Sequence, residues 1–85
     1  MAKLNRMKLT AKEKQAINQA IGRNIRKIRE GNRPKITQET LAERTTFSSL
    51  FIGLIERGKR PAPVATLGAI AKALGVKLSD LFKGV

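Results

Sequence analysis

Two residue types that most often carry metal and acid–base chemistry are missing from this sequence. Its 85 residues include neither cysteine nor histidine. Without cysteine the chain can form no disulfide and offers no thiolate to a metal ion, and without histidine it lacks the commonest metal ligand and general base. We therefore expect no metal and no cofactor. The six acidic residues, with lysine, serine and threonine, suggest no nucleophile and base at a credible spacing, so we do not expect an enzyme.

Long apolar runs are also missing. No stretch approaches the roughly 18 apolar residues needed to cross a bilayer, which predicts a protein that is not embedded in a membrane. The opening residues 1–8 carry positive charge, but no continuous apolar segment follows them, so they do not resemble a secretion signal. These features predict a cytoplasmic protein associated with the nucleoid.

Negative charge is scarce and positive charge dominates. Eighteen Lys and Arg against six Asp and Glu give a net charge of +12, of which residues 1–36 contribute +9 and residues 37–85 contribute +3. Such a surface attracts polyanions, although charge alone leaves open a nucleic acid, an anionic membrane, an acidic protein or a merely solvated face. Residues 1–14 form a basic N-terminal arm or the start of a first helix. This arm either contacts a duplex or acts as a solubilising tail.

The first predicted helix has a clear beginning and end. Thr10 and Glu13 fit a capping box, which marks a helix N-terminus. Isoleucines then recur at spacings of four, four and three residues, as on the buried stripe of a helix: Ile17, Ile21, Ile25 and Ile28. The helix should end near Glu30 or Gly31, because a turn former and a proline follow at 32–34.

Three shorter helices and a terminal turn are predicted after it. The helices span about 38–44, 49–57 and 64–74, and the turn spans 80–83. Their predicted N-caps are Thr37, Ser48 and Ser79, and their predicted glycine stops are Gly58 and Gly75. The residues expected to face inward are Leu41, Ala42, Thr45, Leu67, Ile70, Ala71 and Leu74. Since strand-like alternation is absent, the fold class is all-α, with one compact domain over residues 15–85.

Two of these helices, joined by the three-residue break 45–47, have the dimensions of a helix-turn-helix. Four sequence blocks surround them: Ile25-Arg26-Lys27-Ile28-Arg29, Thr37-Gln38-Glu39-Thr40-Leu41-Ala42, Ile52-Gly53-Leu54-Ile55-Glu56-Arg57-Gly58-Lys59-Arg60-Pro61 and Leu67-Gly68-Ala69-Ile70-Ala71-Lys72-Ala73-Leu74-Gly75-Val76. Through these blocks the chain resembles, over about residues 17–82, the lambda repressor and Cro-like domains, also called the Xre or Cro/C1-type helix-turn-helix family. The resemblance implies a compact five-helix domain whose second and third helices bind DNA, usually as a homodimer on a palindromic operator.

The chain departs from the family pattern in two places. Thr46 stands where glycine is common, which predicts a strained or slightly different turn, because a β-branched residue adopts a positive φ only at a cost. The connection 31–36 is about two residues longer than usual. Its Arg33 and Lys35 are expected to reach the DNA backbone.

The resemblance also implies phosphate contacts and one internal ion pair. Gln38 occupies the family's phosphate-binding position at the start of the second helix, and three basic residues follow the third helix at backbone-contacting positions: Arg57, Lys59 and Arg60. The plainer alternative for each is a solvated polar residue. Arg29 and Glu56 stand where the family pairs an arginine with a carboxylate inside the domain, which is a structural role.

The resemblance implies that the third helix contacts the bases, through Ser48, Ser49, Leu50, Gly53 and Leu54. Helical spacing places Leu50 and Leu54 nearly opposite the inward-facing isoleucines of that helix. Leucine cannot make bidentate hydrogen bonds to a base, but it can pack on a thymine methyl, which favours A and T at the centre of each half-site. Alternatively, Leu50, Phe51 and Leu54 form an exposed apolar patch for another protein.

Together these features predict a sequence-specific double-stranded DNA-binding transcriptional regulator, of the repressor kind, that acts as a homodimer. A phage repressor, a restriction-modification controller and the antitoxin of a toxin–antitoxin pair remain open. Part of an apolar C-terminal set is expected to line the dimer contact: Leu78, Leu81, Phe82 and Val85. The rival prediction is an adaptor that binds a protein partner, such as a toxin or another regulator, through the third helix.

Overall fold

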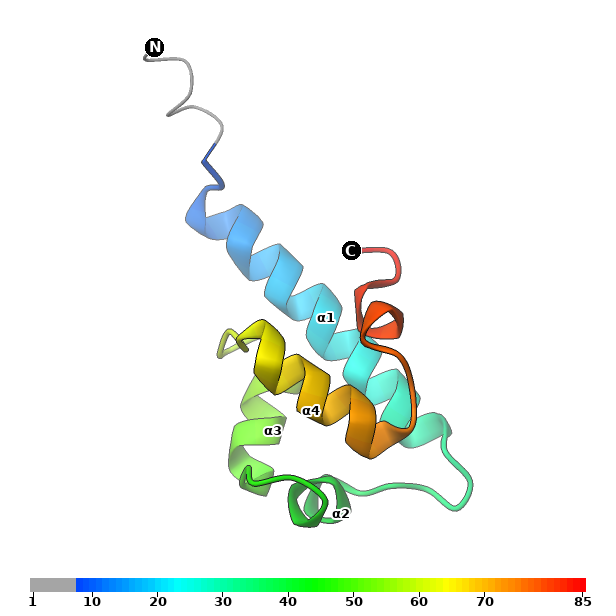
Figure 1. Ribbon diagram of the computed structural model, residues 1–85. Helices are drawn as coiled ribbons and strands as arrows, with labels where there is room; N and C mark the ends of the chain where they lie inside the picture. The colour runs from blue at the N-terminus through cyan, green and yellow to red at the C-terminus, as the bar shows by residue number, and fades with distance from the viewer. Residues whose placement is uncertain (1–7) are drawn as a thin grey trace.

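The computed structural model describes residues 8–85 as a chain of helices joined by short loops (Figure 1). Its elements are α1 (Ala11–Gly31), α2 (Gln38–Glu43), α3 (Ser49–Glu56), α4 (Val64–Leu74) and the 3-10 helix η2 (Leu78–Phe82). No strand occurs within residues 8–85, so the all-α prediction is confirmed. The predicted fifth helix is a short 3-10 helix.

The helix α1 begins with the predicted capping box. The Thr10 hydroxyl accepts a hydrogen bond from the Glu13 N–H at 3.1 Å, and the Glu13 carboxylate accepts one from the Thr10 N–H at 2.8 Å. The helix therefore includes residues 11–14 of the predicted basic arm, whereas residues 1–7 lie outside the described part of the chain. Its first turns extend beyond α3 and α4 and are exposed (Figure 1).

Side-chain caps also begin α2 and α3 where the sequence predicts them. The Thr37 hydroxyl accepts from the Thr40 N–H, and the Ser48 hydroxyl accepts from the Phe51 N–H. The predicted cap at Ser79 is wrong. The carboxylate of Asp80 accepts from the N–H of Lys77 at 3.0 Å, so the last element begins after Lys77 instead. The helix η2 starts before the predicted residue 80 because the charged Asp80 carboxylate is a strong acceptor for the Lys77 N–H, which no helical carbonyl bonds.

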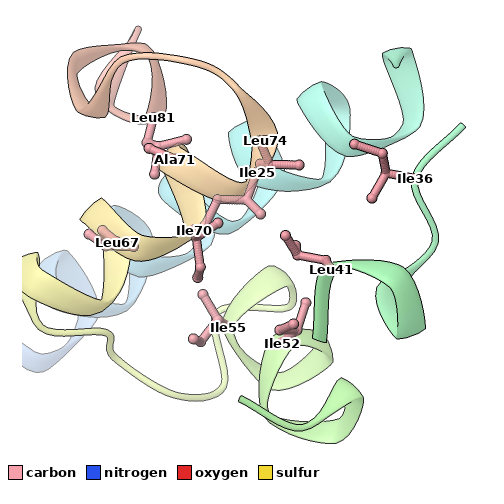
Figure 2. Packing of buried hydrophobic residues seen from close by; sticks show 10 residues of the cluster. All are labelled: Ile25, Ile36, Leu41, Ile52, Ile55, Leu67, Ile70, Ala71, Leu74 and Leu81. Atoms are coloured by element: carbon pink, nitrogen blue, oxygen red, sulfur yellow. The ribbon is translucent and has the colours of Figure 1, made fainter. Parts of the chain in front are cut away.

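One apolar cluster joins all five elements (Figure 2). Its members are Ile25, Ile36, Leu41, Ile52, Ile55, Leu67, Ile70, Ala71, Leu74 and Leu81. This confirms the inward face predicted for α4 in full, while Ile21 and Ile28 of the α1 stripe pack at the edge of the cluster. Since burying an aliphatic side chain is worth about 1.5–3 kcal/mol, this cluster is what holds α2 and α3 against α1 and α4.

The helix α1 crosses the end of α3 at Gly22. A Cβ atom at Gly22 would lie 2.5 Å from the carbonyl oxygen of Glu56, and closer still to that of Ile55. The two backbones are therefore almost in contact, which only glycine permits. This crossing sets the position of the C-terminal end of α3 relative to α1.

The substitution Gly22→Ala should lower the free energy of unfolding by about 1–3 kcal/mol, because the methyl group must push the two backbones apart. Urea denaturation measures the change. Gly68→Ala in α4 is the matched control, since its Cβ would meet no atom within 4 Å. Removing a mid-helix glycine there should instead add roughly 0.5–1 kcal/mol. Equal effects of the two substitutions would contradict the close crossing.

Candidate functional site

The helix α3 buries one side and exposes the opposite one. Ile52 and Ile55 are in the core, whereas Leu50 is 69% exposed and Leu54 is half-buried outside the core cluster. At 100° per residue, Leu50 and Leu54 share the side facing away from the core. Ser49, half-buried, lies at the start of the same helix. We call Ser49, Leu50 and Leu54 the outer face of α3; Ser48 is exposed beside it and uses its hydroxyl as the N-cap.

Gly53 does not belong to this outer face, although the sequence placed it among the base-contacting residues. It is buried, and a Cβ atom there would lie 3.2 Å from Nη1 of Arg57 and 3.5 Å from the amide atoms of Gln38. Gly53 therefore lies beneath these two polar groups, at ordinary contact distance from the Gln38 amide.

A buried ion pair joins α1 to α3. Arg29 Nε donates to Glu56 Oε2 at 2.7 Å and Nη2 donates to Oε1 at 3.0 Å, so the contact is bidentate. The third nitrogen, Nη1, donates to the carbonyl of Ile36 at 3.1 Å. The hydrogen bond to Glu56 raises the pKa of Arg29 above its ordinary value, against the effect of burial. The pair expected from the sequence thus also fixes the loop that leads into α2.

The same carboxylate orients Gln38, the first residue of α2. Nε2 of Gln38 donates to Oε1 of Glu56 at 3.0 Å. An amide nitrogen carries two N–H groups, so this bond leaves one donor and the carbonyl oxygen for other partners. Gln38 is half-buried, with its amide beside Gly53. Its position therefore depends on the buried ion pair.

The basic segment after α3 follows a fixed turn. Gly58 has φ +69°, and a Cβ there would lie 2.5 Å from Cγ and 2.8 Å from Cα of Gln19 in α1. The N–H of Lys59 donates to the carbonyl of Leu54 at 2.9 Å. Glycine is required at this turn for both its backbone angle and its close packing. The turn leaves Arg57, Lys59 and Arg60 exposed on one short segment.

The two basic residues of the α1–α2 connection behave differently. Nη1 of Arg33 donates to the carbonyls of Glu30 at 2.9 Å and Asn32 at 2.8 Å. Arg33 thus folds back over the end of α1 but is exposed, and its contact with the DNA backbone stays a prediction. Lys35 is exposed.

The turn between α2 and α3 needs no left-handed residue. Within residues 8–85, positive φ angles occur only at glycines, so the strain expected at Thr46 is absent. The hydroxyl of Thr45 lies 3.0 Å from the carbonyl of Leu41, to which it donates, and accepts from the N–H of Phe47 at 3.2 Å. This local hydrogen bonding lets the chain turn with ordinary backbone angles.

Phe51 packs inward instead of forming part of an exposed apolar patch. It is half-buried against the core, and its ring centroid lies 5.2 Å from that of Phe47 with the planes tilted by 51°. The guanidinium carbon of Arg60 lies 5.7 Å from the centroid of the Phe51 ring. No spacing in the sequence predicts this contact. The predicted apolar patch is thereby reduced to Leu50 and Leu54.

Within the described residues, no three or more Asp, Glu, His or Cys lie together in a way that could hold a metal ion. None of the helices in that part of the chain has both the length and the apolar character to span a membrane.

Replacing Glu56 by alanine should destabilise the fold by about 3–5 kcal/mol, because it leaves the Arg29 charge buried without a partner. Chemical denaturation of Glu56→Ala measures this loss. The matched control is Glu30→Ala, which breaks the exposed Arg26–Glu30 pair of 3.3 Å and should cost less than about 0.5 kcal/mol. A small cost for Glu56→Ala, similar to the control, would show that the pair is not buried in solution.

The chain is similar to one known family and to two curated proteins. A family model described as "Helix-turn-helix" matches residues 25–81. An uncharacterized HTH-type transcriptional regulator, y4dJ of Sinorhizobium fredii (strain NBRC 101917 / NGR234), is 36% identical over 61 residues, which cover 72% of this chain and 77% of that protein. The immunity repressor protein of Bacillus phage phi105 is 37% identical over 61 residues, which cover 72% of this chain and 41% of that protein. No solved structure was found to match the chain significantly.

Proposed function

The chain belongs to the helix-turn-helix family, as its sequence blocks suggested, and we propose that it is a sequence-specific double-stranded DNA-binding transcriptional regulator. The observation that carries the proposal is the outer face of α3, which points away from the core, carries the exposed Leu50 and lies beside the basic segment 57–60. The name of one relative, an immunity repressor, supports repression as its mode of action, and the other relative is named a transcriptional regulator. We propose the cytoplasm as its location.

In the proposed complex α3 lies in the major groove, which admits an α-helix. Its outer face then meets the base edges. The Ser49 hydroxyl can donate to or accept from a base, while Leu50 and Leu54 pack on thymine methyl groups. Sequence preference therefore centres on A·T pairs, supplemented by the shape of the duplex.

The phosphates are bound by groups around α3. Gln38 uses its free amide atoms, and the exposed side chains of Arg57, Lys59 and Arg60 neutralise phosphate charge. Each neutralised phosphate adds about 0.9 to the salt dependence of binding. With a net charge of +12, the chain draws most of its affinity from this electrostatic attraction.

The proposed regulator binds as a homodimer, with one α3 in each half of a palindrome about 34–36 Å apart. Phe82, 36% exposed, and Val85, 50% exposed, are the residues left for this contact. Leu81 is buried in the core, and Leu78 packs against it, so these two have structural roles.

A second candidate function is an adaptor that binds a protein, such as a toxin, through the outer face of α3. The 69% exposure of Leu50 is the observation in its favour. Because Phe51 packs inward, the available apolar surface is smaller than the patch expected from the sequence.

Binding to a randomised DNA duplex pool at low and high salt distinguishes the two functions. We expect enrichment of an A·T-centred palindrome that persists when salt is raised from about 50 to about 200 mM, because base contacts depend little on counterions. Binding that is equal for all sequences and is abolished by salt would contradict the regulator and favour the adaptor.

Two substitutions separate base contacts from phosphate contacts. Leu54→Ala should change the preferred sequence, since it removes a side chain that packs on bases. Lys59→Ala should weaken binding to all sequences alike and lower the salt slope by about 0.9. Selection from the same pool and anisotropy titrations measure both effects. A uniform loss of affinity in both variants would show that the outer face of α3 does not contact bases.

A further inference from the structure

Polar groups flank the outer face of α3 on both sides. At 100° per residue, positions 51 and 53 project to opposite sides of the face that carries Leu50 and Leu54. On the Gly53 side lie Gln38 and Arg57. On the Phe51 side lies Arg60. A helix in the major groove has a phosphate strand on each side, so the two flanks match the two strands.

The two flanks are held by different interactions. Gln38 is fixed by its hydrogen bond to Glu56, which the buried ion pair holds in place. On the other flank, the guanidinium of Arg60 lies 5.7 Å from the centroid of Phe51, within the range of cation–π attraction. Phe51 itself is immobilised by the core and by Phe47, 5.2 Å away. The Phe51 ring therefore holds a fixed position against which the longer Arg60 side chain can rest.

The cation–π contact leaves Arg60 able to bind an anion. A guanidinium has five N–H donors, and attraction to an aromatic ring 5.7 Å away uses its charge and leaves these donors for an acceptor. No hydrogen bond or ion pair joins the Arg60 side chain to any residue between 8 and 85. The Arg57 guanidinium, in comparison, lies beside Gly53 on the other flank.

We propose that Phe51 is a positioning residue that holds the Arg60 guanidinium for a DNA phosphate on the flank of α3 opposite Gln38. The proposal rests on the proposed DNA-binding function and adds a role to a residue that contacts no base. A freely rotating arginine side chain loses rotamer entropy when it binds a phosphate. Arg60 has already lost part of that entropy through its contact with Phe51, so its binding costs less. Phe51 thus strengthens binding only through Arg60.

A double-mutant cycle tests this dependence, with the full chain and a short fluorescein-labelled duplex of mixed sequence. Arg60→Ala should weaken binding about tenfold, as expected for a charged hydrogen bond, and lower the salt slope by about 0.9. Phe51→Leu should weaken binding about threefold by removing the cation–π contact. In the Arg60→Ala background, Phe51→Leu should have no further effect. Phe51→Tyr, which keeps the ring, should bind like the unaltered chain.

Lys59→Ala serves as the matched control, because Lys59 is exposed next to Arg60 and is not stacked on Phe51. Its effect should add to that of Phe51→Leu. The same loss from Phe51→Leu in both the unaltered and the Arg60→Ala background, or no loss in either, would overturn the proposal while leaving DNA binding intact. Failure of the unaltered chain to bind the duplex would overturn the proposed function as well.

Phe51 also packs on the core, so its substitution can impair folding. A second measurement therefore uses the unaltered chain. In NMR spectra of the unaltered chain, the side-chain protons of Arg60 should be shifted upfield by the Phe51 ring and stay shifted after the duplex is added. Random-coil shifts for these protons in the free protein would overturn the proposal.

Discussion

The placement of the two proposed DNA-facing helices depends on one buried carboxylate. Glu56 receives two hydrogen bonds from Arg29 and one from Gln38, so it connects α3 to both α1 and α2. A buried ion pair repays the cost of desolvation only when its hydrogen bonding is complete. Among the described residues no buried side-chain nitrogen or oxygen lacks a partner, and Arg29 also bonds the carbonyl of Ile36. The network therefore fixes the helix-turn-helix as a unit.

Most of the helical framework could be predicted from the sequence because its rules are local. The caps at Thr10, Thr37 and Ser48 and the left-handed Gly75 depend on neighbours within a few residues. The failures were also local. At the C-terminus the Asp80 carboxylate, not Ser79, caps the last element by accepting from the Lys77 N–H. In the α2–α3 turn the Thr45 hydroxyl accepts from the Phe47 N–H, and the strain expected at Thr46 is absent.

The site was less predictable, because the direction of a side chain depends on distant parts of the chain. Phe51, for example, packs against the core instead of facing outward. Gly58 is needed for an approach to Gln19 that no spacing in the sequence reveals. The exposure of Leu50, in contrast, followed directly from the helical spacing of Ile52 and Ile55. Positions along a helix were therefore predictable, whereas contacts between distant residues were not, apart from the Arg29–Glu56 pair that the family resemblance implied.

The outer face of α3 is framed by polar groups, one flank held by a hydrogen bond and the other by a cation–π contact. Chemical-shift mapping of the backbone amides during titration with duplex DNA shows which residues bind. If α3 contacts the bases, the shift changes should gather at Gln38, residues 49–54 and residues 57–60. Changes confined to α4 and η2, with none in α3, would contradict base contact by α3.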